Sequence, residues 1–270
     1  MSQVDSPVPR LGLGTWQLTG EPCRETVRTA LEMGYRHVDT AELYDNEEAV
    51  GAGIDDAAVG RDEVYVATKV LHPRSIDGDP TRGSIRADVI GCLDRLGVDA
   101  VDLLYVHWPS DYDFELVHAT LAELRDEGRI DGVGVSNYQP RHLERALSTD
   151  PEIVANQVEL HPLLPRAELR EFCADAGVDV VAYAPLAHGE VFDVPAIQAV
   201  ADDRGVSVAR LCLAWHRHLG VAAVPKATGE AHLRDNRASR ELELRDDDVA
   251  RIEGIERRER FFDPDYAPDW

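Results

Sequence analysis

Residues 64–68 of the chain are Val-Tyr-Val-Ala-Thr, and residues 179–183 are Asp-Val-Val-Ala-Tyr. Both stretches are apolar almost throughout, which is typical of parallel strands that are covered on both faces. Six further short stretches have a similar β-rich composition. The sequence therefore predicts eight strands, at residues 11–14, 37–40, 64–68, 101–106, 132–135, 153–157, 178–183 and 221–224.

Segments with helical spacing separate these strands. Apolar residues recur every three or four positions in one segment at Ile85, Val89, Cys92 and Leu96, and in another at Phe114, Val117, Leu121 and Leu124. Glycine follows several such segments just before the next strand, where it can end a helix, at Gly34, Gly97, Gly128 and Gly177. Eight strand–helix units predict an α/β protein with a (β/α)8 TIM barrel, a single domain over residues 1–270 with a C-terminal helix and tail.

The main alternative fold is a doubly wound open sheet. Its dinucleotide-binding form carries G-x-G-x-x-G after the first strand. Here the first strand offers Gly12-Leu13-Gly14-Thr15-Trp16-Gln17, which lacks the third glycine. The strand count and this missing glycine favour the barrel.

The charge of the chain limits its partners. Lys and Arg total 28 against 51 Asp and Glu, a formal net charge of −23. Nucleic acid and anionic membranes would repel such a chain. Lys69 and Lys226 are the only lysines, and an acidic surface that keeps arginine resembles those of proteins from salt-loving organisms. We therefore expect lower stability in dilute buffer, and special roles for the two lysines.

The cysteines and the N-terminal sequence indicate a reducing compartment. The four cysteines are scattered and form neither a disulfide framework nor a metal-binding cluster, at Cys23, Cys92, Cys173 and Cys212. The start of the chain has no basic flank followed by an apolar stretch. We expect a cytoplasmic monomer that binds no metal, no nucleic acid and no membrane.

Polar side chains stand repeatedly where the predicted strands end, at Asp39, Lys69, His107, Ser136, Asn137, Gln157, Tyr183 and Lys226. In a barrel the carboxyl ends of the strands meet at one mouth, where the active site lies. Taken singly, each residue has a structural explanation, since Asp39 could cap a turn and His107 could be a hydrogen-bonded core residue. Together they indicate one polar site.

Three of these groups, with the nearby Tyr44, could donate a proton to a carbonyl. A tyrosine has a reference pKa of about 10, and a neighbouring ammonium should lower it. We therefore expect Lys69 to lower the pKa of Tyr44, and Asp39 to keep the buried Lys69 charged. His107 could donate a hydrogen bond to the substrate oxygen.

The same residues carry a resemblance to the aldo-keto reductase family, and within it to the prokaryotic diketogluconate-reductase-like branch. The family's motifs follow in order over nearly the whole chain as GLGTW, HVDTAELYDNE, ATK, LLYVHWP, GVSNY, NQVELHP, AYAPL and VPK. The resemblance implies a catalytic tetrad of Asp39, Tyr44, Lys69 and His107, with Tyr44 as the general acid. It implies NAD(P)H-dependent reduction of aldehydes and ketones to alcohols, an oxidoreductase activity. The cofactor would be held by Gly14, Thr15, Trp16, Asp39, Ser136, Asn137, Gln157, Tyr183, Pro185, Leu186, Lys226, Ala227, Thr228, His232, Asp235 and Asn236.

The chain departs from the family pattern where the 2′-phosphate of the cofactor would bind. Ala227, His232 and Asp235 stand where the family usually has Ser, Arg and Glu. Lys226 keeps one cation, so NADP(H) is favoured, with NAD(H) or dual use as alternatives, and Arg234 or Arg237 could turn inward to help.

A small-molecule carbonyl substrate would be enclosed by an apolar, aromatic wall made of Trp16, Tyr44, Leu71, His107 and Trp108, with Tyr112 as a further candidate. The final residues, 261–270, could fold over the mouth or fray. A second class of function also fits the resemblance: a cofactor-binding, redox-sensing or regulatory barrel with little turnover. Measured NADPH oxidation with a panel of aldehydes would separate the two.

Overall fold

The computed structural model describes residues 8–76, 78–149 and 153–268. In these parts of the chain, eight strands form one parallel sheet in sequence order. They are β1 (Leu13–Gly14), β2 (His37–Asp39), β3 (Tyr65–Val70), β4 (Val101–Val106), β5 (Ile130–Ser136), β6 (Ile153–Glu159), β7 (Asp179–Tyr183) and β8 (Ala222–Ala223). Each predicted strand is present, with ends that differ by a few residues.

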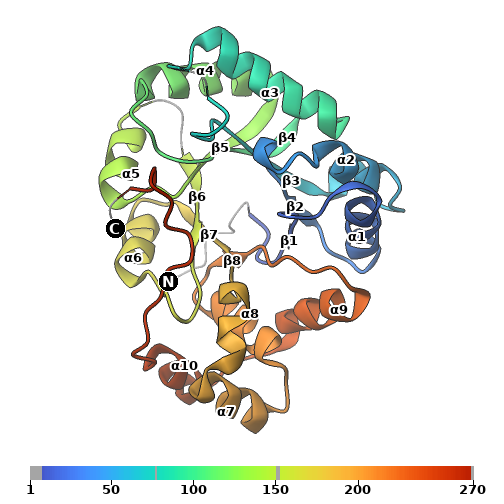
Figure 1. The fold of residues 1–270 in the computed structure, drawn as a ribbon, viewed down its shortest axis with the longest axis vertical. Helices are drawn as coiled ribbons and strands as arrows, with labels where there is room; N and C mark the ends of the chain where they lie inside the picture. The colour runs from blue at the N-terminus through green and yellow to red at the C-terminus, as the bar shows by residue number, and fades with distance from the viewer. Residues whose placement is uncertain (1–7, 77, 150–152, 269–270) are drawn as a thin grey trace.

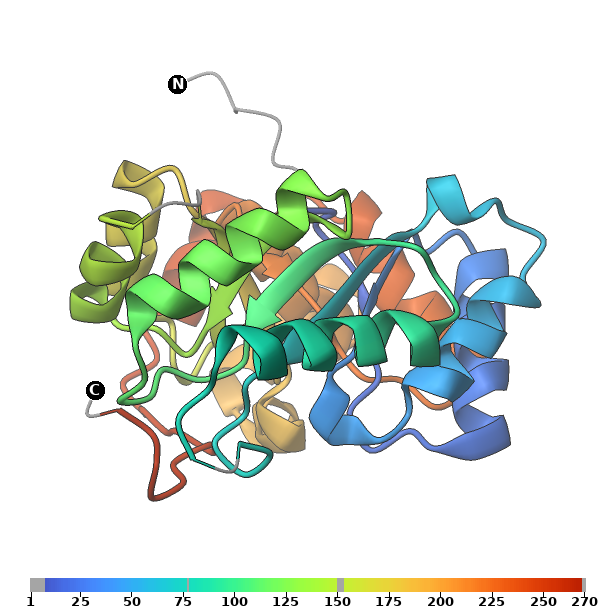
Figure 2. The same ribbon diagram turned by 90° about the horizontal axis from the view of Figure 1, so that it is seen from above.

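The sheet curls so that its first and last strands meet. A parallel bridge joins Leu11 to Ala223, and the backbone N–H of Gly12 donates to the carbonyl of Ala223 at 2.9 Å. Figure 1 shows the strands in the middle with helices around them, and Figure 2 gives the same arrangement from above. The arrangement matches the predicted (β/α)8 class.

The helices follow the predicted pattern of apolar faces. The eight apolar residues expected to face the core in α3 and α4 are all buried there. The four glycines expected to end helices have positive φ, from +67° at Gly97 to +93° at Gly34, which glycine adopts without strain. The α-helices are α1 (Gly20–Glu32), α2 (Glu47–Asp55), α3 (Arg82–Leu96), α4 (Phe114–Asp126), α5 (Pro140–Leu147), α6 (Ala167–Asp175), α7 (Pro195–Arg204), α8 (Val208–His218), α9 (Glu230–Ala238) and α10 (Asp246–Glu253). Short 3-10 helices are η1 (Glu42–Tyr44), η2 (Arg61–Glu63), η3 (Ala187–Asp193) and η4 (Ser239–Glu241).

Two hydrophobic layers hold the sheet in place. Successive strand residues point to opposite faces, and in β4 the residues Leu104 and Val106 belong to the large core shared with the helices. Leu103 and Tyr105 belong instead to a small cluster inside the curled sheet, together with Val8, Ala67, Ala155, Val181, Ala222 and Val224. The interior is therefore filled, and polar side chains are found above it, at the carboxyl ends of the strands.

The C-terminal region differs from a simple solvated helix. The predicted terminal helix is the short α10, which buries Val249 and Ile252, and the chain after it runs as an irregular segment past β6 and β7 (Figure 1). Residues 261, 262, 263, 264 and 266 line a cavity at the mouth, so the described part of the tail folds over the site; Trp270 lies outside the described residues.

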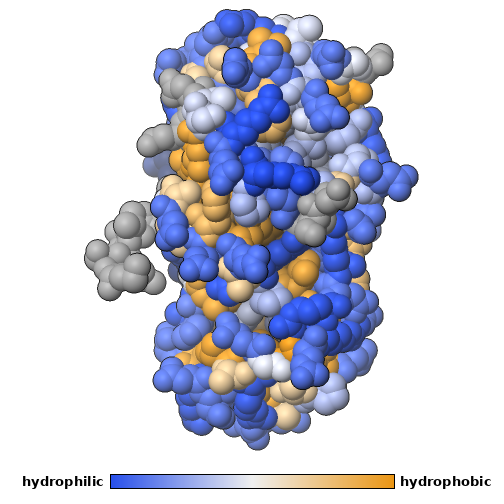
Figure 3. Space-filling view, turned by 90° about the vertical axis from the view of Figure 1, so that its left-hand side faces the viewer, coloured by the Kyte–Doolittle hydropathy of each residue, from blue (hydrophilic) through white to orange (hydrophobic). Residues whose placement is uncertain are grey.

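The surface is mostly hydrophilic on the face drawn in Figure 3. No helix in the described ranges is both long and apolar enough to cross a membrane.

Candidate functional site

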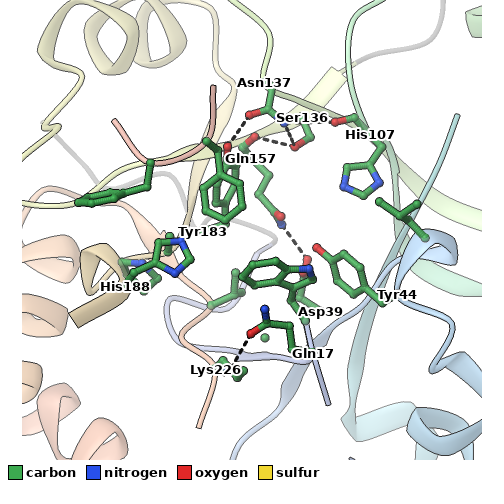
Figure 4. Close-up of a pocket in the computed structure, with 18 of the residues that line it drawn as sticks. Gln17, Asp39, Tyr44, His107, Ser136, Asn137, Gln157, Tyr183, His188 and Lys226 are labelled. Atoms are coloured by element: carbon green, nitrogen blue, oxygen red, sulfur yellow. Dashed lines mark hydrogen bonds between the residues drawn. The ribbon is translucent and has the colours of Figure 1, made fainter. Parts of the chain in front are cut away.

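A cavity of about 740 Å³ lies at the carboxyl ends of the strands. Figure 4 shows Tyr44 and His107 on one side of it and Tyr183 and His188 on the other. The structure brings most of the predicted site residues together at this cavity. Those that line it are Gly14, Thr15, Trp16, Asp39, Tyr44, His107, Trp108, Ser136, Asn137, Gln157, Tyr183, Pro185, Leu186 and Lys226.

A buried ion pair lies beneath the cavity. Lys69, on β3, is 1% exposed, and its ammonium donates to Oδ1 of Asp39 at 2.5 Å and to the carbonyl of Thr40 at 2.8 Å. Burial is the largest single effect and lowers the pKa of Lys69, but the Asp39 carboxylate and the Tyr44 hydroxyl together raise it by more, so the pKa lies above the ordinary value. Lys69 therefore stays charged, as the sequence predicted.

Tyr44 is carried by the short helix η1, directly after β2. Its hydroxyl lies 3.5 Å from Nζ of Lys69, at the outer limit of a hydrogen bond, and the ammonium is 5.1 Å from the ring centroid. Asn46 anchors this turn by donating to the carbonyls of Thr15 and Leu18 at 2.9 and 2.8 Å. These contacts fix the phenol beside the ammonium.

The expected change in the acidity of Tyr44 is wrong for this structure. The neighbouring ammonium of Lys69 does lower the pKa of Tyr44, as expected from the sequence. Burial of the phenol raises it by more, so the pKa of Tyr44 lies above its ordinary value. Tyr44 is therefore protonated at neutral pH and available as a proton donor.

His107 follows β4 and is neutral. Burial, with smaller contributions from Lys69 and His72, places its pKa well below the ordinary value. Its ring packs edge-on against Tyr44 and His72, with centroids 6.0 and 4.8 Å apart. A neutral imidazole can donate one hydrogen bond to a substrate oxygen without carrying charge.

Amide and hydroxyl side chains at the ends of β5, β6 and β7 form the opposite wall. The hydroxyl of Tyr183 donates to Oδ1 of Asn137 at 2.8 Å, and Ser136 donates to the backbone carbonyl of Gln157 at 2.9 Å. The amide of Gln157 donates to the second oxygen of Asp39 at 2.7 Å. Asp39 therefore has a partner for each oxygen, and this group links β2, β3 and β6.

The expected phosphate end of the cofactor site is only partly assembled. Lys226 lies at the edge of the cavity and donates to Oε1 of Gln17 at 3.0 Å. The other predicted residues of this end do not line the cavity: Ala227 and Asn236 are buried, Thr228 and His232 are exposed outside it, and Asp235 pairs with Arg210 at 2.8 Å. Arg234 pairs with Glu230, and Arg237 lies beside Gly34, so neither arginine turns inward.

The substrate wall needs two corrections. Leu71 packs in the core with 1% exposure, because its φ of +59° turns the chain as it leaves β3, and His72 lines the cavity in its place. Tyr112 is buried behind the wall, where its hydroxyl bonds that of Tyr138 at 2.7 Å. Trp16 and Trp108 do line the cavity.

Several lining residues were missed by the sequence reasoning: Gln17, Leu43, His72, Arg74, Ala184, His188, Gly189, Phe192, Val224, Pro225, and Phe261, Phe262, Asp263, Pro264 and Tyr266 of the tail. His72 carried a readable signal, since it is a titratable residue just after a predicted strand. For the tail, the sequence left folding over the mouth and fraying as equal alternatives, because the contacts of the tail are with residues distant in the sequence.

The described residues contain no group of three or more His, Cys, Asp or Glu side chains placed to bind a metal ion. The four cysteines are free and buried.

The comparisons with known proteins agree with this geometry. The model of the aldo/keto reductase family matches residues 10–257. The chain is 38% identical over 252 residues to an aldo-keto reductase of Mycobacterium sp. (strain KMS), covering 92% of this chain and 90% of that protein. It is 35% identical over 256 residues to the glyoxal reductase of Bacillus subtilis (strain 168), covering 94% and 91%. A crystal structure described as a putative 2,5-diketo-D-gluconic acid reductase B has a TM-score of 0.91 at 31% identity, covering 97% and 94%.

Fold, site and relatives together define an oxidoreductase that reduces carbonyl groups. The chain belongs to the aldo/keto reductase family. Members of this family work with nicotinamide cofactors.

The pH dependence of carbonyl reduction follows from the two neutral groups. Because the pKa of His107 lies well below 6.5, its neutral form is lost only as pH falls through that lowered value, and Tyr44 keeps its proton beyond pH 10. We expect kcat/KM for an aldehyde, at saturating NADPH, to be constant from about pH 6 to pH 9. An inflection near pH 6.5 would contradict the assignment of a neutral His107.

Proposed function

We propose that this protein reduces aldehydes and ketones to alcohols with NADPH, and that Tyr44 is the general acid. One observation carries the proposal. The Tyr44 hydroxyl borders the cavity and lies 3.5 Å from the buried ammonium of Lys69, which in turn bonds Asp39 at 2.5 Å. A protonated phenol next to a fixed positive charge can release its proton when negative charge develops on a carbonyl oxygen.

A bound nicotinamide cofactor would supply the hydride for the carbonyl carbon, and negative charge would then develop on the carbonyl oxygen. Tyr44 gives that oxygen its proton, which completes the alcohol. Lys69 stabilises the phenolate left behind, and Asp39 balances the charge of Lys69. His107, with its neutral ring, orients the carbonyl oxygen by a hydrogen bond.

The nicotinamide end of the cavity has the side chains that such a cofactor needs. Ser136, Asn137 and Gln157 supply donors and acceptors for a carboxamide, and the ring of Tyr183 offers a stacking surface. Asn137 and Gln157 are at most 1% exposed, so their positions are fixed before a ligand arrives.

Replacing Tyr44 by phenylalanine removes the acid and little else. Tyr44→Phe should lower kcat for aldehyde reduction by about two orders of magnitude or more, the scale expected for a lost general acid. NADPH binding, followed by fluorescence titration, should stay within about twofold of wild type.

Tyr35→Phe is the matched control, because its hydroxyl donates to the carbonyl of Leu233 at 2.9 Å, and Tyr35 does not line the cavity. A Tyr44→Phe variant with the wild-type rate would rule out the proposed acid.

The preference for NADPH depends on Lys226. It is the single predicted phosphate ligand that lines the cavity, and Gln17 is its one hydrogen-bond partner in the described residues. A 2′-phosphate would add a charge-assisted contact there, whereas NADH would not use it. Without an arginine nearby we expect a moderate preference for NADPH with some use of NADH.

Lys226→Gln should raise the KM for NADPH about tenfold and leave that for NADH within about twofold, because only NADPH carries the 2′-phosphate. Arg234→Gln is the control, since that guanidinium pairs with Glu230 outside the cavity. Equal changes in the KM for NADPH and the KM for NADH would show that Lys226 does not select between the two cofactors.

Two substrate classes follow from the cavity. Apolar aldehydes suit the aromatic part of the cavity, which is formed by Trp16, Trp108 and the aromatic residues of the tail. Arg74 also lines the cavity and has no carboxylate partner in the described part of the chain. Its guanidinium lies 5.5 Å from the Tyr266 ring centroid. An unpaired guanidinium suits a carbonyl compound that bears a carboxylate. This contact supports our proposal that the chain belongs with the diketogluconate-reductase-like branch. Measuring kcat/KM for glyoxal, benzaldehyde and a keto acid ranks the substrate classes.

The regulatory alternative has no support from the relatives, whose names describe reductases. We further propose that the chain acts as a single-domain monomer in the cytoplasm. The four buried cysteines, all free, suit a reducing compartment.

We also propose adaptation to concentrated salt. Apart from Lys69 and His161, the described residues form their ion pairs with arginine. At −23 the acidic surface repels itself in dilute buffer, and salt screens that repulsion.

The midpoint of thermal unfolding should therefore rise as KCl increases from dilute to about 2 M. Sucrose is the control, because it stabilises proteins by exclusion without screening charge. A midpoint that does not change with KCl would contradict the proposed salt adaptation.

A further inference from the structure

Glu159, in the NQVELHP motif at the end of β6, has no part in the mechanism above. It is 0% exposed, yet its carboxylate is ionised at neutral pH. Burial acts to raise its pKa, but hydrogen bonds from His161 and from two backbone amides outweigh burial, so the pKa lies below the ordinary value. A buried charge with several donors around it needs a structural or functional reason.

The two backbone amides belong to the C-terminal tail. The N–H of Phe261 donates to Oε1 of Glu159 at 2.8 Å, and the N–H of Phe262 donates to Oε2 at 3.0 Å. His161 contacts Oε1 at 3.0 Å through Nε2, and its ring packs on Phe261 with centroids 5.5 Å apart. Both carboxylate oxygens are therefore used to hold one point of the tail.

This point of attachment decides where Phe262 lies. Its ring packs against Trp16, Tyr183 and His188, with centroid distances of 5.4, 5.2 and 5.0 Å. Four residues further on, the hydroxyl of Tyr266 lies 3.2 Å from Nε2 of His72. The tail thus crosses the cavity from the side of Tyr183 to the side of His107, and Glu159 holds it on the Tyr183 side.

We propose that Glu159 is a positioning residue that determines substrate specificity: its carboxylate holds the backbone of Phe261 and Phe262 and thereby places Phe262 as a wall of the substrate cavity. The proposal rests on the proposed function, because it concerns the carbonyl compound reduced at that site. Glu159 touches neither Tyr44 nor His107, so the chemical step does not depend on it. A bulky apolar aldehyde reaches Phe262, whereas glyoxal is too small to need it.

Glu159→Gln tests this, because an amide keeps one acceptor oxygen but cannot accept a hydrogen bond through its nitrogen. In wild type, hydrogen–deuterium exchange should show protected amides at Phe261 and Phe262, and in Glu159→Gln that protection should be lost while β-strand peptides keep theirs. The ratio of kcat/KM for benzaldehyde to that for glyoxal should fall about tenfold, through KM for benzaldehyde. The rate with glyoxal should stay within about twofold.

Two further variants separate positioning from a loss of stability. Phe262→Ala should lower the ratio of kcat/KM for benzaldehyde to that for glyoxal, while the backbone amides of residues 261 and 262 stay protected from exchange. The double variant Glu159→Gln/Phe262→Ala should have a ratio less than about twofold below that of Phe262→Ala, because both changes act through the same wall. Glu259→Gln is the control, because that carboxylate pairs with Arg257 outside the cavity and should change neither ratio nor protection.

Unchanged amide protection in Glu159→Gln, an equal loss of activity toward both aldehydes, or an unchanged ratio in Phe262→Ala would each overturn the proposal. Phe262→Ala tests the role of this wall even if Glu159→Gln does not fold. A wild-type chain that reduces no aldehyde would overturn the proposed function instead, and amide exchange would then still show whether Glu159 holds the tail.

Discussion

The structure of the site depends on one buried ion pair, that between Lys69 and Asp39. An ammonium with 1% exposure is costly in a protein interior, and it is tolerated because Asp39 lies 2.5 Å away and the Thr40 carbonyl accepts a second hydrogen bond. Gln157 satisfies the other oxygen of Asp39 from β6. The pair therefore fixes three strand ends relative to one another, and Tyr44 takes its position from them.

Burial explains why the remaining titratable groups of the site are neutral. Lys69 and Asp39 cancel each other, and in the described residues the buried histidines His72 and His107 have pKa values lowered mainly by burial, that of His72 to about 4. Tyr44 keeps its proton for the same reason. Negative charge that develops on a bound carbonyl oxygen would therefore lie next to the neutral His107 ring and the Tyr44 hydroxyl, with the Lys69 ammonium behind them. No ionised carboxylate other than that of Asp39, which is paired with Lys69, is needed at this point, although the chain as a whole is strongly acidic.

The sequence predicted the parts of this structure that depend on local pattern. Eight apolar stretches became eight strands, and polar residues at their ends met at one cavity because parallel strands end on the same side. The prediction from sequence was wrong where a single backbone angle determines the direction of a side chain. Leu71 was expected to line the cavity, but it has a positive φ and its side chain is buried in the core. The prediction was also wrong for Asp235, which pairs with Arg210 on α8, and no motif records that contact. The acidity of Tyr44 was misjudged because burial, which opposes the ammonium, cannot be read from residue spacing.

The tail shows a different limit of sequence reasoning and a different use of a strand end. Glu159 stands 102 and 103 positions before the amides that it binds, and any residue except proline could supply such amides. A backbone-directed contact holds the position of the tail while leaving the side chain at position 262 free to differ. The strand ends can then keep one set of proton-donating groups, while substitutions in the tail change the shape of the cavity in front of them without loosening the segment that carries them.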